Sequence, residues 1–210
     1  MNTANRKRGR PPGQDSALMR ENILDAAEER FARRGYAATP LREIADAAGV
    51  NPAMVHYYFG SKHDLLRQVL ERTLQPLAAA IAGMRQAGHA PAPELSRLIS
   101  STVRTHPNLP VLMVREVMLP GGAMQQRFLE EMAPRLGGAL PDMLAGEQGQ
   151  GRLAQDLDPG VTALLLLALS IFPYIVRNVA EPGMGIPYDE AGLDALEWHI
   201  SRMIERGIAP

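Results

Sequence analysis

The sequence contains no cysteine, which excludes disulfide bonds and metal sites built on thiolates. It also lacks an apolar signal-peptide core near its N-terminus. The longest apolar run, 161–176, has 16 residues and includes a threonine, a serine and a proline. A membrane-spanning helix needs about 20 apolar residues. We therefore expect a cytoplasmic protein with no membrane partner.

A strong net charge is also missing, because the 210 residues carry a formal charge of only −1. The distribution of charge is more informative. Residues 1–62 hold ten Lys and Arg against seven Asp and Glu, while residues 63–210 hold twelve against sixteen. The first fourteen residues contain no acidic side chain. They contain four basic side chains, Arg6, Lys7, Arg8 and Arg10. A basic end on a mildly acidic body is typical of proteins that contact a polyanion.

No segment alternates apolar and polar residues convincingly as a strand would, whereas a 3.6-residue period recurs along the whole chain. We therefore predict an all-α fold. Helices are expected at about 16–34, at 41–48 and at 52–59, followed by a long helix that begins at Lys62. Proline and glycine divide the rest of the chain into further helices.

The expected helix ends carry residues that favour them. Gly35 suits a left-handed C-terminal cap, and Ser61 suits the N-cap of the helix that begins at Lys62. Thr39 and Asn51 each precede a proline. This pattern predicts a capping side chain followed by proline at the first helical position.

The helices at 41–48 and 52–59 are joined by a three-residue turn, Gly49-Val50-Asn51, which is the spacing of a helix-turn-helix. Gly49 permits the positive φ that the turn favours. Small or apolar residues stand where the two helices would pack together, namely Ile44, Ala45, Val50 and Val55. The pattern predicts one rigid helix pair.

The run from Thr39 to Lys62 reads TPLREIADAAGVNPAMVHYYFGSK. It closely resembles the DNA-binding motif of the TetR (tetracycline-repressor-like) family, and its closing Tyr-Tyr-Phe-Gly-Ser-Lys segment is the strongest signal. The resemblance covers about residues 16–70. Residues 71–210 are similar to the family only in length and helical character.

The resemblance implies a transcriptional repressor whose helix at 52–59 enters the major groove of a pseudo-palindromic DNA operator. Base contacts are expected from Arg42, Pro52, Ala53, Met54 and His56. Phosphate contacts are expected from Tyr57, Tyr58 and Lys62, with the caps Thr39 and Asn51 at the same interface. Two alternatives stand beside these assignments, Tyr58 as a core residue and His56 as a solvated side chain.

The segment Arg8-Gly9-Arg10-Pro11 is similar to the centre of an AT-hook, whose arginines enter the narrow minor groove of A·T-rich DNA. The alternative is a basic tail that touches phosphates without sequence preference. Either mode favours DNA binding.

No constellation for catalysis is found. The five histidines are scattered, and the Gly-Gly and Gly-x-Gly segments lack the strand–loop–helix context of a phosphate loop. We therefore expect no enzyme activity, no metal and no cofactor. A helical carrier protein would leave the helix-turn-helix unexplained. An architectural DNA-binding protein would not need residues 71–210.

The chain is expected to divide into a flexible arm at 1–15, a three-helix DNA-binding domain at 16–62 and a helical domain at 63–210 that binds an effector and dimerises. The apolar segments at 159–180 and 188–207 are the expected homodimer surface, because the resembling family pairs its last two helices in a four-helix bundle. The second segment carries one apolar stripe, Leu193, Leu196, Ile200, Met203 and Ile204.

Adaptable methionines and aromatic side chains in the C-terminal domain predict a pocket for a small, mostly apolar effector. The residues assigned to this pocket are Met84, Met113, Met118, Phe128, Phe172 and Tyr174. The alternative for each is a place in the ordinary core. Arg115-Glu116 is either a contact for a polar group of the ligand or a surface pair.

Overall fold

The computed structural model describes residues 12–208, and within them every regular element is a helix. The arm residues Arg6, Lys7, Arg8 and Arg10 lie outside the described residues. The elements in chain order are α1 (Pro12–Arg34), α2 (Leu41–Ala48), α3 (Pro52–Phe59), α4 (Lys62–Ala87), α5 (Ala92–Thr105), α6 (Leu109–Met113), η1 (Val114–Met118), α7 (Gln125–Arg127), η2 (Phe128–Met132), η3 (Ala133–Arg135), η4 (Gly137–Ala139), α8 (Leu140–Gly149), α9 (Pro159–Ile175), α10 (Arg177–Met184) and α11 (Glu190–Ile208).

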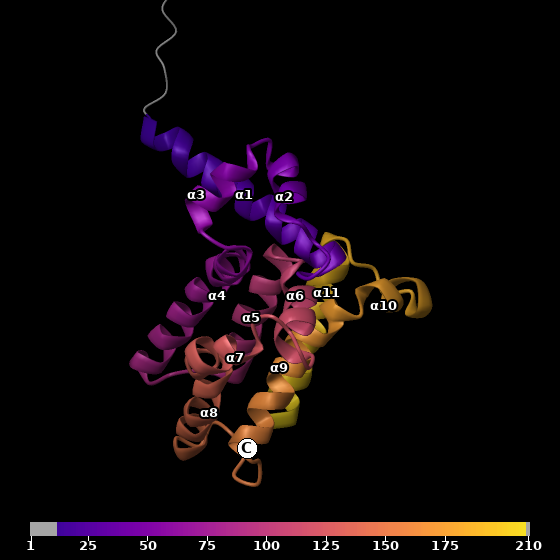
Figure 1. The fold of residues 1–210 in the computed structure, drawn as a ribbon. Coiled ribbons are helices and arrows are strands. Elements are labelled where there is room, and N and C mark those ends of the chain that lie inside the picture. Colours follow the sequence, from indigo (N-terminus) through magenta and orange to yellow (C-terminus); the bar gives the residue numbers. More distant parts are fainter. Residues whose placement is uncertain (1–11, 209–210) are drawn as a thin grey trace, which may run out of the picture. The chain divides into compact units, whose positions relative to one another are not determined.

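Along the sequence the chain divides into two compact units between Val69 and Leu70, within α4 (Figure 1). The sequence predicts a domain boundary after residue 62, at the start of the same helix. The first unit contains α1, α2, α3 and the first turns of α4. The second unit contains the rest of α4 and all later helices.

In the first unit, α2 packs against both α1 and α3. The core is made of buried apolar side chains from all these helices: Ile23, Leu24, Phe31, Ile44, Val55, Phe59, Leu65 and Leu66. The predicted bounds of α2 and α3 are confirmed, whereas α1 begins at Pro12, earlier than the predicted residue 16. The periodic apolar face at 23–31 is the part of α1 that enters the core.

Three of the helix-end predictions are confirmed. Gly35 has a φ of 83°, and its N–H donates to the carbonyl of Phe31. The Asn51 side chain accepts a hydrogen bond from the Ala53 N–H at 2.9 Å, and Ser61 Oγ accepts one from the Asp64 N–H at 3.0 Å. These side chains satisfy amides at helix starts, which have no partner within the helix.

The predicted cap at Thr39 is wrong. The N-cap of α2 is Pro40, whose position makes no side-chain cap hydrogen bond, and the helix begins at Leu41. The Thr39 hydroxyl instead donates to the carbonyl of Gly35 at 2.7 Å, and the side chain is fully buried. The hydroxyl therefore satisfies a carbonyl just past the end of α1 rather than an amide of α2.

In the second unit, α5 packs against α9 and α11, and α9 also packs against α8 (Figure 1). Two buried serines join α5 to α9, with Ser96 Oγ and Ser170 Oγ 2.8 Å apart. The Ser170 hydroxyl donates to the carbonyl of Leu166 at 2.7 Å, so Ser96 is the donor of the pair. The buried leucines and isoleucines of this unit include Leu95, Ile99, Leu144, Leu166 and Ile200.

Two of the five residues in the stripe predicted on the last helix as a dimer surface are part of this core. Ile200 and Ile204 of α11 are 5% and 4% exposed, while Leu193 and Leu196 are half-buried. Because α11 packs on α5, Ile200 and Ile204 are covered within the same chain. Met203 alone among the five is strongly exposed.

Residues 109–139 contain only short helical pieces, including the π-helical η1 and η2 and the 3₁₀-helical η3 and η4. Gly122 is required in this segment, because a Cβ there would lie 2.5 Å from the carbonyl oxygen of Glu116. The same oxygen accepts a hydrogen bond from the Met124 N–H at 2.8 Å. The segment therefore folds back closely on itself without forming a long helix.

Glu147 of α8 ties three parts of the second unit together. Its buried carboxylate accepts hydrogen bonds from the Ala90 N–H, before α5, at 2.8 Å and from the guanidinium of Arg152, after α8, at 2.6 and 2.8 Å. Chiefly because of the Arg152 hydrogen bond, the pKa of Glu147 lies below its usual value, although burial opposes this.

Among the described residues, no single helix is long and apolar enough to cross a membrane. The helices α9 and α10 reach the necessary length and composition only as a pair, and the pair is bent by 72°.

The low pKa of Glu147 predicts a loss of stability in acid. A carboxylate with a lowered folded-state pKa contributes stability above its unfolded pKa, and this contribution disappears as the pH falls through the folded pKa. We expect Glu147→Gln to lower the free energy of unfolding near pH 7 by about 1–3 kcal/mol. Below about pH 4, the difference from wild type should shrink.

Denaturant unfolding at both pH values measures this difference. Asp142→Asn, an exposed position on the same helix, is the matched control and should stay close to wild type. A deficit of Glu147→Gln that is equal at both pH values would contradict the assignment.

Candidate nucleic-acid interface and an apolar cavity

The turn between α2 and α3 fixes the direction in which α3 leaves. Gly49 has a φ of 67°, in the left-handed region where a side chain is strained. The Val50 N–H donates to the carbonyl of Ala45 at 3.0 Å and closes the end of α2. With Asn51 capping α3, the predicted chemistry of the turn is confirmed.

The helix α3 buries Val55 and Phe59 and leaves its other sides accessible. The exposed or half-buried side chains are the ones predicted to face DNA, namely Pro52, Ala53, Met54, His56 and Tyr57. Tyr57 is 80% exposed, which is unusual for an aromatic side chain without a ligand. The accessible side of α3 therefore combines three apolar side chains with the imidazole of His56 and the hydroxyl of Tyr57.

His56 is held in a defined tautomer. Its Nδ1 lies 2.9 Å from the carbonyl oxygen of Gly60. A carbonyl oxygen only accepts hydrogen bonds, so Nδ1 carries the proton, and Nε2 of the neutral ring is a hydrogen-bond acceptor.

Tyr58 is half-buried, and its hydroxyl lies 3.0 Å from Ser16 Oγ. This hydrogen bond links α3 to α1. The Tyr58 ring also meets the Tyr57 ring edge-on, with centroids 5.3 Å apart. Tyr58 therefore has a structural contact, whichever role it has toward DNA.

Lys62 makes contacts within the protein that the sequence pattern did not predict. Its ammonium donates to the carbonyls of Tyr36 at 2.7 Å and Thr39 at 2.9 Å, with a longer contact to Ala37 at 3.4 Å. The Nζ atom also lies 4.3 Å from the centroid of the Tyr36 ring. In this arrangement Lys62 fastens the start of α4 to the loop between α1 and α2.

Arg42 lies exposed on α2. The neighbouring carboxylate of Glu43 is held by two other arginines, Arg34 at 2.5 Å and Arg30 at 3.6 Å. The acidic group next to Arg42 in the sequence is thus already paired.

The start of α4 carries a reciprocal cap. The Ser61 hydroxyl donates to Asp64 Oδ2 at 2.6 Å, while its oxygen accepts the Asp64 N–H. Chiefly because of the Ser61 hydroxyl, the pKa of Asp64 lies below its ordinary value. The charged carboxylate near this helix start also suits the helix dipole.

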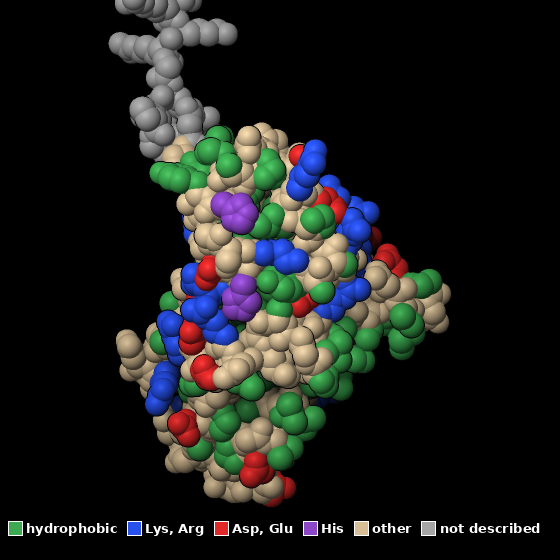
Figure 2. Space-filling view, in the orientation of Figure 1, with side chains coloured by type: hydrophobic (Ala, Val, Ile, Leu, Met, Phe, Trp, Pro, Cys, Tyr) green, Lys and Arg blue, Asp and Glu red, His purple; other side chains and the backbone are tan. Residues whose placement is uncertain are grey.

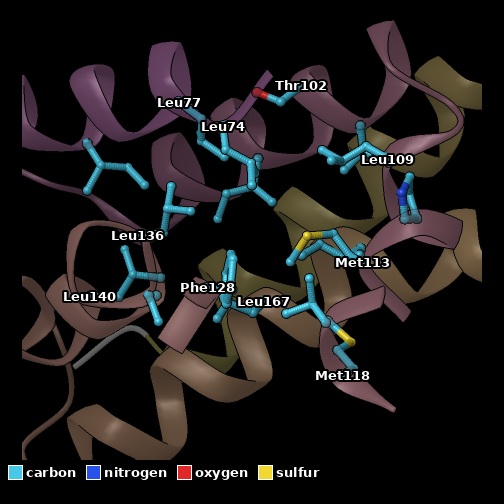
Figure 3. Close-up of a pocket in the computed structure, with 18 of the residues that line it drawn as sticks. Leu74, Leu77, Thr102, Leu109, Met113, Met118, Phe128, Leu136, Leu140 and Leu167 are labelled. Carbon is cyan, nitrogen blue, oxygen red and sulfur yellow. The ribbon is translucent and has the colours of Figure 1, made fainter. Parts of the chain in front are cut away.

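The second unit contains a cavity of about 230 Å³ (Figure 3). Its wall is formed by α4, α5, α6, α9, the irregular segment that follows α6 and the first residue of α8. The lining residues are Leu74, Leu77, Ile81, Ile99, Thr102, Val103, Leu109, Pro110, Met113, Val117, Met118, Phe128, Ala133, Leu136, Gly137, Gly138, Leu140, Leu167 and Ile171.

The structure divides the residues predicted for an effector pocket into two sets. Met113, Met118 and Phe128 line this cavity (Figure 3). Met84 lines a separate, smaller hollow of about 150 Å³ beside Glu147. Phe172 is 58% exposed on α9, and Tyr174, which is half-buried, is also absent from the cavity wall.

The sequence did not predict the aliphatic side chains that form most of the cavity wall. Leu74 and Leu77 of α4 and Leu167 of α9 line the cavity, and leucines at helical spacing look the same in a sequence whether they fill a core or border a void. Arg115 and Glu116 do not line it. No group of three His, Asp or Glu among the described residues is placed to hold a metal ion.

Comparison with known proteins gives the same picture for the first unit. The family model described as "Bacterial regulatory proteins, tetR family" matches residues 23–69. The chain is similar to the HTH-type transcriptional repressor NicS of Pseudomonas putida, with 27% identity over 76% of this chain and 77% of that protein. It is also similar to the HTH-type transcriptional regulator BetI of Rhizobium meliloti, with 34% identity over 41% of this chain and 43% of BetI. The chain thus matches less than half of the length of BetI.

The fold is also that of solved regulators. The structure of NalD, the secondary repressor of the MexAB-OprM multidrug efflux pump in Pseudomonas aeruginosa, superposes with a TM-score of 0.69. The superposition covers 93% of this chain and 98% of NalD, at 23% sequence identity. The likeness extends over both units and establishes the all-α fold with an N-terminal helix-turn-helix domain.

The contacts of Lys62 predict a stability defect when it is shortened. We expect Lys62→Ala to lower the free energy of unfolding by about 1–3 kcal/mol, because three backbone carbonyls lose a charged donor. Thermal or denaturant unfolding without DNA measures this loss. Arg33→Ala removes an equal charge from an exposed site and is the matched control. If Lys62→Ala unfolds like wild type and loses only DNA affinity, its main contact is a phosphate instead.

Proposed function

Because the chain belongs to the TetR family of bacterial regulatory proteins and is a DNA-binding transcriptional regulator, we propose that it is a repressor that binds a pseudo-palindromic operator as a homodimer. A small, mostly apolar effector binds in the second unit and releases the protein from DNA. The observation that carries the proposal is α3, which is capped by Asn51 and fixed to α2 while its N-terminal residues face solvent.

Two side chains supply directed readout of bases. The exposed guanidinium of Arg42 is able to donate two hydrogen bonds to O6 and N7 of a guanine. With Nδ1 donating to the Gly60 carbonyl in the neutral tautomer, His56 presents Nε2 as an acceptor, which suits the amino group of adenine or cytosine. Pro52, Ala53 and Met54 have no hydrogen-bonding side-chain group, so their contribution is apolar contact with thymine methyl groups.

Phosphate contacts position the protein without reading sequence. Tyr57 is assigned to this role because its hydroxyl is free to extend from an exposed ring. Tyr58 and Lys62 remain assigned to the same surface, alongside their contacts within the protein. The arm adds the charges of Arg6, Lys7, Arg8 and Arg10, in an A·T-rich minor groove or along phosphates.

The homodimer is assigned mainly to α9. Its exposed apolar side chains fall at positions 161, 164, 165, 168 and 172, which is one face of a helix. Trp198 of α11 is 60% exposed as well. Hydrophobic side chains also reach the surface of the second unit in Figure 2. A two-fold pairing of this face would cover apolar area that a monomer leaves in water.

The effector is assigned to the cavity of the second unit. A ligand changes operator affinity only by its different affinities for the DNA-bound and free conformations. Two DNA-binding units must reach major grooves about 34 Å apart, so a ligand that favours another spacing weakens binding. The helix α4 is the proposed lever, because it starts in the first unit and carries Leu74 and Leu77 of the cavity wall.

Selection of bound duplexes from a random pool tests the central proposal, and we expect it to yield an inverted repeat. Arg42→Ala should then relax the preference at one guanine in each half-site, with a loss of about 1–3 kcal/mol of discrimination. His56→Ala should relax a different position, an adenine or a cytosine. A pool that stays random at physiological salt would remove the claim of sequence-specific binding. Equal losses on operator and random DNA would remove the base contact of Arg42.

Dimerisation is tested with Leu164→Glu, which places a charge in the centre of the exposed α9 face. We expect a monomer in analytical ultracentrifugation, with operator affinity reduced at least about tenfold, because one half-site contact is lost. Leu129→Glu, an equally exposed leucine on η2, is the control and should remain dimeric. A dimeric Leu164→Glu protein would show that the interface lies elsewhere.

A further inference from the structure

The cavity in the second unit is unusual in its lack of polar groups. None of its nineteen lining residues is Asp, Glu, Lys, Arg or His. Almost no polar atom reaches its surface. A typical ligand site instead combines an apolar lining with a few directed polar groups.

Thr102 has the only polar side chain in the wall (Figure 3). Its hydroxyl donates to the carbonyl of Leu98 at 2.8 Å, within α5. A hydroxyl has one proton, so Thr102 has none left to give to a ligand. It therefore cannot stabilise an anion by donating a hydrogen bond.

The charged residues of the adjoining segment do not compensate. Arg115 is exposed and does not line the cavity. Glu116 is buried in the same element, η1, yet it lies outside the lining as well. A carboxylate or an ammonium group buried against this lining would lose its hydration and gain no counter-charge, which is strongly unfavourable.

We propose that the effector of this protein is an uncharged, hydrocarbon-like molecule, recognised by shape and dispersion rather than by hydrogen bonds. This inference rests on the proposed function, because it assigns a chemical class to the effector of that same site. Acidic or basic molecules of the same carbon skeleton enter only in their neutral form.

The volume sets the size of the molecule. A dry apolar cavity of roughly 150 Å³ is known to accept benzene. The cavity here measures about 230 Å³. It therefore suits a somewhat larger guest, of about eight to ten carbon atoms.

The test compares octan-1-ol with octanoate, which share chain length and differ in charge. Isothermal calorimetry or thermal shift on the full dimer measures the affinity of each. We expect saturable binding of octan-1-ol that does not change between pH 5.5 and 7.5. Octanoate should bind roughly 1000-fold more weakly at pH 7.5, where only about one molecule in a thousand is protonated. Its affinity should rise tenfold for each pH unit that the solution is made more acidic, because no titratable side chain lines the cavity.

Two variants locate the binding. Met113→Trp fills the cavity and should abolish binding of octan-1-ol. Leu129→Trp adds the same ring at an exposed position outside the lining and should bind like wild type. Thr102→Val removes the only hydroxyl of the wall and should leave the affinity unchanged within about twofold.

Octanoate that binds as tightly as octan-1-ol at pH 7.5, or the absence of octan-1-ol binding to wild type, would overturn the inference. Binding of octan-1-ol that Met113→Trp leaves intact would overturn it as well. The proposed function is read separately from an operator-release titration. If octan-1-ol binds in the cavity but releases no operator DNA, control of DNA binding by this ligand is contradicted. The preference of the cavity for uncharged molecules is still supported in that case.

Discussion

The ammonium group of Lys62 is the contact around which the first unit is arranged. It binds the carbonyls of Tyr36 and Thr39 from the start of α4, while the Thr39 hydroxyl binds the carbonyl of Gly35. Carbonyls beyond the end of a helix need partners, and here two side chains provide them. Because this loop precedes α2, and α2 leads to α3 through the turn at Gly49, the contacts of Lys62 act together with the core to position the exposed surface of α3.

The fold of the first unit could be predicted from its sequence because most of its signals act locally. Gly49 and Asn51 influence only residues within one helical turn, so their effect does not depend on the rest of the molecule. Thr39 precedes a proline just as Asn51 does, yet its hydroxyl turns back to Gly35. A capping rule considers the residues after the cap. It does not include the carbonyls that follow the preceding helix. The contacts of Lys62 were not predicted for the same reason, because they too are made to carbonyls that follow α1.

The second unit could be predicted only as a set of helices. Its sequence shows which residues are apolar but not what covers them. Ile200 and Ile204 are covered by the same chain, whereas Leu164 and Phe172 of α9 are left exposed. Both pairs obey the same helical period. The cavity was anticipated from methionines and aromatic side chains, yet leucine, isoleucine and valine together supply most of its wall. A void arises from the spacing of helices and not from any one residue type.

The side chains that line a cavity of this kind have no packing partner on one side, so they lack dispersion contacts that a close-packed core would provide. A guest regains the lost dispersion contacts simply by filling the space. It needs no hydrogen bond to do so, and a charge would forfeit the gain through desolvation. The same physical term that makes the void costly therefore selects an uncharged ligand.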